Sequence, residues 1–263
     1  MALAQIGDAA RTRWEMILQC SLGASLIFAR GMVDEAREAL TRGLSLARTF
    51  RDFDYQQRAM HKLWLFSFRL AAFDDALAIA RDYDAVVRLH DPQSRAVAAG
   101  LVGAPQVYRG EHIEASTRLR RAIDHYPIAC RSRDAIRLGN DLIASAFGQL
   151  SVSLLSQGLL DTASRAALQA VEEARGRRQP IMLCAALAFA AGFVFLSLGE
   201  FDTAERHSEE LIVLGQKHAL RPFHAAGLCI RGGLATRRTD PNGGVDLLRR
   251  GLADLQAASY LLL

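Results

Sequence analysis

Cysteines and histidines are the residues most able to bind a metal or act as nucleophile or base, and here they are scattered. No two cysteines form a CxxC motif, and no histidine lies at metal-ligand spacing from any pair of them. The cysteines are Cys20, Cys130, Cys184 and Cys229. Only His218 and His224, which flank Pro222, could meet through a loop. We expect buried free thiols, ordinary loop histidines, no metal site and no cofactor.

Other catalytic motifs are also missing from the sequence. Neither Ser25 nor Ser45 lies in a GxSxG elbow. Acidic pairs such as Glu172–Glu173 fall on solvated helix faces, and general acid–base catalysis needs a desolvated pocket. No GxxxxGK[ST] phosphate loop occurs. The sequence therefore predicts no catalytic residues and a protein that is not an enzyme.

The basic residues are almost all arginines and give a modest formal net charge of +4. Their clusters lack the interleaved aromatic side chains on which single-stranded nucleic acid stacks. The clusters lie at Arg118–Arg121, Arg131–Arg137, Arg175–Arg178, Arg237–Arg238 and Arg249–Arg250. We expect solvated surfaces, or contacts with an acidic partner, rather than direct binding of nucleic acid.

The elements that must carry these residues are predicted to be helices throughout. Apolar residues make up 51% of the chain, with few prolines and almost no alternating β-branched runs. The uncharged segment 181–198 has the length of a membrane span. Because it occupies the place of a first helix in the repeat below, we expect a buried helix of a cytoplasmic protein. Membrane association stays a weaker alternative.

Turn signals recur about every forty residues. Small residues close six turns, with spacings of 40, 39, 48, 41 and 40, at Ala36, Ala76, Ala115, Ala163, Ala204 and Gly244. Five residues before each comes a turn residue suited to a left-handed C-cap, namely Gly31, Ala71, Gly110, Gly158, Gly199 and Thr239. An aspartate three residues later suits the start of the next helix, at Asp34, Asp74, Asp161 and Asp202.

Mostly small residues also recur seven positions before each turn residue, where the two helices of a hairpin are predicted to cross. They are Ala24, Trp64, Gly103, Ser151, Gly192 and Gly232. Trp64 departs from the pattern and predicts looser packing in the second hairpin. Pro105 lies inside the first helix of the third hairpin and is expected to kink or break it.

The repeat predicts an all-α fold, an α-α superhelix of about six hairpins. We place repeats 1–3 in residues 1–127 and repeats 4–6 in residues 128–263 of one continuous solenoid. The long spacing before Ala163 predicts a joint near 127–133. The end at Leu261, Leu262 and Leu263 lacks a polar cap, which indicates truncation or coverage by a second copy in a homodimer.

The small-residue positions resemble those of the tetratricopeptide repeat. Several stretches also resemble the helical-repeat region of bacterial winged-helix, signal-transduction-ATPase transcriptional regulators. These are RWEMILQCSLGASLIFARG (13–31), DYQQRAMHKLWLF (54–66), LLSQGLLDTASRAALQAVEEAR (154–175), LCAALAFAA (183–191) and GEFDTAERH (199–207). The resemblance implies an interaction or sensor arm, whose partner could be such a regulator's ATPase or DNA-binding domain.

First helices of such stacks line the concave face, which gives a candidate partner-binding groove. It would comprise Arg58, His61, Leu65, Phe68, Arg69, Val107, Tyr108, Phe189, Phe193 and Leu196. Aromatic and aliphatic side chains with a few basic groups suit an amphipathic helix or an extended peptide. Two alternatives stay open: a small-molecule effector pocket between repeats two and five, and plain packing of these residues against the next hairpin.

Overall fold

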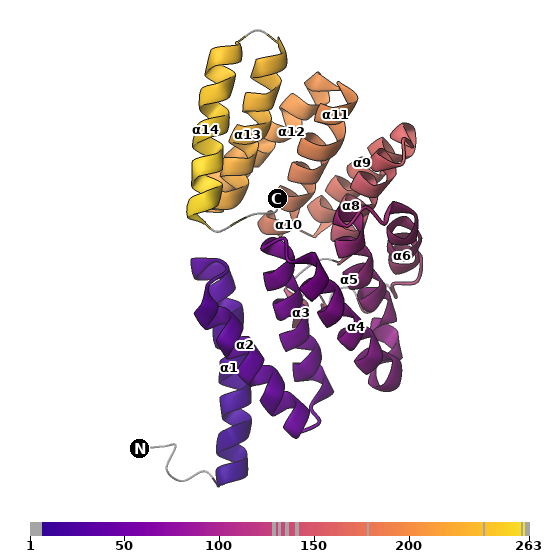
Figure 1. The fold of residues 1–263 in the computed structure, drawn as a ribbon, viewed down its shortest axis with the longest axis vertical. Helices are drawn as coiled ribbons and strands as arrows, with labels where there is room; N and C mark the ends of the chain where they lie inside the picture. Colours follow the sequence, from indigo (N-terminus) through magenta and orange to yellow (C-terminus); the bar gives the residue numbers. More distant parts are fainter. Residues whose placement is uncertain are drawn as a thin grey trace.

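The computed structural model describes residues 7–127, 130, 133–134, 137–139, 142–177, 179–238, 240–258 and 260, and these residues contain no strand. They form six helical hairpins (Figure 1). The hairpins are α1 (Asp8–Arg30) with α2 (Asp34–Thr49), α3 (Phe53–Arg69) with α4 (Phe73–His90), α5 (Arg95–Tyr108) with α6 (His112–Asp124), α8 (Leu142–Ser156) with α9 (Leu160–Gly176), α10 (Pro180–Ala188), η3 (Phe189–Phe195) and α11 (Leu196–Leu198) with α12 (Phe201–Lys217), and α13 (Arg221–Arg238) with α14 (Pro241–Ala257). The predicted all-α superhelix is confirmed.

The hairpins follow a curve that brings the last one close to the first. In Figure 1 the yellow end of α14 lies beside the turn between α1 and α2. A Cβ atom built on Gly31, in that turn, would lie 3.0 Å from the carbonyl oxygen of Ala258. Tyr260 packs against the cluster that contains Ile27 and Phe66. The superhelix therefore closes on itself around its inner surface.

The described turn residues have the predicted positive φ, although Gly31, with ψ −154°, is extended rather than αL. Gly31, Ala71, Gly110, Gly158 and Gly199 have φ values of 83°, 55°, 80°, 74° and 76°. Thr239 lies outside the described residues. The aspartates at 34, 74, 161 and 202 all occupy the first turn of a second helix, as expected for carboxylates near a positive dipole end. Turn chemistry therefore sets where each hairpin reverses.

Close helix approach explains the small residues in two of the predicted positions. A Cβ on Gly103 would lie 3.0 Å from Leu119 Cγ of α6. One on Gly232 would lie 2.7 Å from the carbonyl oxygen of Gly244 in α14, and even a methyl group does not fit at that distance. These glycines face their hairpin partners, as predicted.

Two other positions differ from the prediction. In the first hairpin Gly23, not Ala24, faces α2, and its Cβ would lie 2.9 Å from the oxygen of Ala36. Gly192 faces Ile230 of α13, in the next hairpin, at 3.5 Å. It lies in a π-helical segment, whose extra residue per turn rotates the following side chains out of the α-helical register.

Pro105 does not break its helix, which continues to Tyr108. A proline at this position cannot donate to the carbonyl of Leu101, four residues earlier. The indole Nε1 of Trp64 donates to that oxygen instead, at 2.9 Å. Trp64 therefore faces α5 of the next hairpin, where its indole N–H satisfies the acceptor that Pro105 leaves free.

The apolar segment 180–198 is the one helix of the described residues with the length and composition of a membrane span. More than half of its most apolar window is buried inside the protein. Cys184, Leu187 and Val194 are fully buried, in the same core cluster as Leu154. The segment therefore forms core, as expected from its place in the repeat.

A buried polar network attaches the connector between α6 and α8 to the second hairpin. The guanidinium of Arg137 donates to Asp54 Oδ1 at 3.0 Å and to Gln57 Oε1 at 2.9 Å, both on α3. It also pairs with Asp134, whose side chain is fully buried and accepts from Tyr126 at 3.0 Å. The predicted joint near 127–133, of which only part is described, is thus followed by a segment held tightly by charge-assisted hydrogen bonds.

Candidate partner-binding groove

An apolar cavity lies on the inner surface, where helices from five of the hairpins converge. Its lining side chains come from α1, α3, α8, α10, η3 and α13, and the largest are Ile27, Trp64, Leu65, Phe68, Ile181, Met182, Phe189, Phe223 and Tyr260. The polar groups at its wall are those of Arg69, Ser145 and Gln149. Its volume is about 70 Å³. Ligand pockets typically measure about 300–1,000 Å³, so the cavity is closed in this conformation.

Aromatic rings stiffen the side of the cavity formed by α3. The ring centroids of Trp64 and Phe68 lie 4.8 Å apart in a nearly parallel stack. Phe68 also meets Tyr108 edge-on at 5.6 Å, and Tyr108 stacks on Phe73 at 5.1 Å. Such contacts add about 0.5–1.5 kcal/mol each beyond area burial. The second and third hairpins therefore present one rigid aromatic wall.

Tyr260 closes the cavity near the end of α1. The guanidinium carbon of Arg69 lies 5.4 Å from the centre of its ring, within cation–π range. The ring packs beside Ile27, and both residues line the cavity. Tyr260 follows α14 by only three residues, so movement of the last hairpin would open the inner surface.

Two basic side chains are buried behind the wall. His61 is fully buried, and neither ring nitrogen has a hydrogen-bond partner among the described residues. Burial, with smaller contributions from Lys62 and Arg137, holds the pKa of His61 well below its usual 6.5. Burial also lowers the pKa of Lys62 to about 8, while its Nζ donates to the carbonyl of Leu138 at 2.7 Å.

Stability is expected to fall as the pH drops from about 6.5 to 5. His61 stays neutral in the folded protein, whereas the unfolded chain takes up its proton, so unfolding binds protons in this range. One such group changes the unfolding free energy by at most about 1.4 kcal/mol per pH unit. His207, whose pKa burial also lowers, acts in the same direction.

Urea denaturation between pH 5 and 7.5 measures this slope. His61→Leu should reduce it, and His218→Gln, at an exposed position, should leave it unchanged. A slope that is identical in the wild type and in His61→Leu would contradict the assignment.

The structure separates the predicted groove residues into four groups. Leu65, Phe68, Arg69 and Phe189 line the central cavity, and Val107 and Tyr108 pack in the cores behind it. Phe193 and Leu196 line a second cavity of about 240 Å³ against α13 and α14. Arg58, which pairs with Asp54 at 2.8 Å, and the buried His61 do not line either cavity.

Sequence reasoning missed the residues that complete the cavity, among them Ser145, Gln149, Ile181, Phe223 and Tyr260. The prediction assumed that residues at the same distance from each turn line the groove in every hairpin. The cavity instead meets the last turns of α3 and the first turns of α10 and α13. In a curved superhelix the position that faces the centre shifts from one first helix to the next, and a prediction that allowed for this shift would include these residues.

Two solved structures have a similar fold. The chain superimposes on a Rap protein complexed with competence and sporulation factor, with a TM-score of 0.62 and 13% identity, over 93% of this chain and 77% of the other. It also matches a signal-transduction ATPase with a tetratricopeptide repeat sensor from Pyrococcus horikoshii, with a TM-score of 0.50 and 14% identity. That match covers 93% of this chain but only 37% of the other.

No protein-family model and no curated protein matches the sequence. At these identities the two structures show the fold alone. The chain therefore has the superhelical fold of tetratricopeptide-like repeat proteins.

Proposed function

We propose that the chain is a non-catalytic interaction or sensor module that binds a protein or peptide partner on its inner surface. As in the regulators that its sequence resembles, this module would belong to a transcriptional or signalling regulator in the bacterial cytoplasm. It requires no cofactor, nucleic acid or membrane. The supporting structures are a repeat protein solved with a bound factor and an ATPase with a repeat sensor.

The convergence of apolar side chains from separate hairpins on one cavity is the observation that carries this proposal. An amphipathic helix needs apolar anchor pockets with a few polar groups at the edge. Leu65, Phe68 and Phe189 supply the apolar surface, and Arg69 and Gln149 supply the polar edge. Because these residues come from different hairpins, a bound partner would fix the spacing between hairpins.

Binding of a peptide requires the closed superhelix to open between its first and last hairpins. The cavity of about 70 Å³ is too small for a helix, and the contact between Gly31 and Ala258 closes the superhelix beside it. Tyr260 would leave Arg69 as the last hairpin moves away. A partner then stabilises the open state by as much as its affinity for the two states differs.

Peptide display on the immobilised protein tests the proposal. Leu65→Glu places a charge in the cavity wall and is expected to abolish binding of the selected peptides, because an unpaired carboxylate would be desolvated against them. The matched control Leu168→Glu lies on α9 at a position that is 42% exposed, and should bind as the wild type does. Equal binding by both variants would sink the proposal for this surface.

A small-molecule effector is the second candidate function. The cavity joins α3 of the second hairpin to α10 of the fifth, which is where an effector pocket between repeats would lie. A thermal-shift screen of metabolites separates the two functions. A compound that raises the melting temperature of the wild type but not of Ala185→Trp, which fills the cavity, favours the effector.

A further inference from the structure

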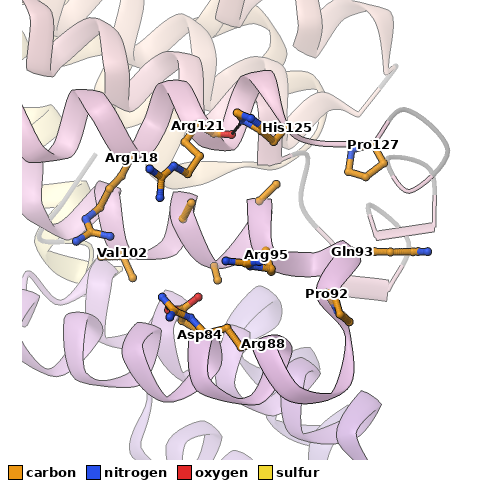
Figure 2. Close-up of a pocket in the computed structure, with 13 residues that line it drawn as sticks. Asp84, Arg88, Pro92, Gln93, Arg95, Val102, Arg118, Arg121, His125 and Pro127 are labelled. Carbon is orange, nitrogen blue, oxygen red and sulfur yellow. Dashed lines mark hydrogen bonds and ion pairs between the residues drawn. The ribbon is translucent and has the colours of Figure 1, made fainter.

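A groove on the outer surface, distinct from the inner cavity, carries a concentration of arginines. The α4–α6 groove has walls from α4 and α6 and a floor from α5, and its volume is about 390 Å³ (Figure 2). Arg88 comes from α4, Arg95 from α5, and Arg118 and Arg121 from α6. Figure 2 shows their guanidinium groups between the two walls, with His125 near one end.

Most of this positive charge is uncompensated. Asp84 is the one acidic residue that lines the groove, and it pairs with Arg88 at 2.7 Å. Within the part of the chain that the structure describes, Arg95, Arg118 and Arg121 form no ion pair or hydrogen bond with another side chain. With His125 neutral, the groove has a net charge of about +3. Like charges held together in this way favour an anion between them.

The floor of the groove is apolar and limits what the anion can be. Ala96, Ala98 and Val102 are buried and line it, and Pro92 and Pro127 lie among the residues at one end. Guanidinium groups match the oxygens of phosphate with paired hydrogen bonds. None of the lining residues is a phenylalanine, tyrosine or tryptophan, so no base-stacking platform for nucleic acid exists there.

We propose that the α4–α6 groove binds a small phosphorylated organic molecule with two or more negative charges. Arg118 and Arg121 lie one helical turn apart on the same face of α6 and take the phosphate oxygens together with Arg95. The alanine and valine floor receives the organic part. The volume lies in the usual range for small-ligand sites.

Calorimetric titration of the full chain at low ionic strength tests the site with four probes. These are inorganic pyrophosphate, ATP, adenosine and hexaglutamate. ATP should bind more tightly than pyrophosphate because it also covers the apolar floor, and adenosine should not bind measurably. Raising the salt concentration should weaken both phosphate probes, because the arginines are exposed.

The double variant Arg118→Ala/Arg121→Ala should weaken ATP binding at least about ten-fold. Arg120→Ala removes another exposed arginine of α6, one that does not line the groove, and should change affinity less than about two-fold. Circular dichroism and the melting temperature show that each variant is folded.

Three results would overturn the proposal. The first is equal weakening by Arg120→Ala, which would indicate a diffuse basic surface. The second is hexaglutamate binding as tightly as ATP, which would indicate an acidic protein partner. The third is no binding of either phosphate probe at millimolar concentration.

Discussion

Replacement of Arg137 by methionine is expected to lower the free energy of unfolding by about 2–3 kcal/mol, because it removes two charge-assisted hydrogen bonds from a largely buried network. The side chain is 10% exposed and bridges Asp54, Gln57 and the fully buried Asp134. Methionine keeps the volume but donates no hydrogen bond. The connector between α6 and α8 would lose these two hydrogen bonds to α3 but keep the one from Lys62 Nζ to the carbonyl of Leu138.

Urea denaturation followed by circular dichroism measures the effect. Arg37→Met is the control, because Arg37 pairs with Asp34 on the surface with both side chains more than half exposed. Exposed pairs contribute about 0–1 kcal/mol. Similar losses in the two variants would show that the Arg137 network does not stabilise the fold.

Gly232→Ala should destabilise the last hairpin by about 1–3 kcal/mol, although alanine is the better helix former. The added methyl would lie 2.7 Å from the carbonyl oxygen of Gly244 and 2.8 Å from Leu248 Cγ, so α14 must move away from α13. The last hairpin of a stack packs against one neighbouring repeat and can unfold locally. Hydrogen exchange of the α13 and α14 amides is therefore the most sensitive measurement.

Gly100→Ala is the matched control within α5. Its added methyl would meet Ala122 Cβ at 3.7 Å, an ordinary contact. Helix propensity alone then predicts a gain of up to about 1 kcal/mol. The same substitution should thus change stability in opposite directions at the two sites. If both variants gained stability, close approach at Gly232 would not be what holds this hairpin together.

Local chemistry made the fold predictable from the sequence. A left-handed residue such as Gly158, followed by an aspartate such as Asp161, specifies a hairpin turn without knowledge of the rest of the chain. Features that depend on tertiary context were not accessible in this way. The π-helical turn that moves Gly192 toward α13 has no sequence signal, and the role of Pro105 depends on Trp64, forty-one positions away.

The candidate site was less predictable than the fold for a geometric reason. Residues at the same distance from their interhelical loops lie on the same face of their helices. In a curved stack, however, a different part of each successive helix reaches the centre. Leu65 and Phe189 reach the cavity, whereas Phe193 reaches a neighbouring one. Tyr260 follows the last hairpin and has no repeat position from which it could have been inferred. The joint between repeats three and four, of which only part is described, and the homodimer through 261–263, which lie outside the described residues, stay predictions.

The position of Trp64 in the cavity wall gives the protein a built-in fluorescent probe. The chain has two tryptophans, and Trp14 is 51% exposed whereas Trp64 is 5% exposed in the cavity wall. A Trp14→Phe variant would emit from Trp64 alone. Its emission wavelength would then report, without any added dye, whether water or a bound molecule reaches the inner cavity of the superhelix.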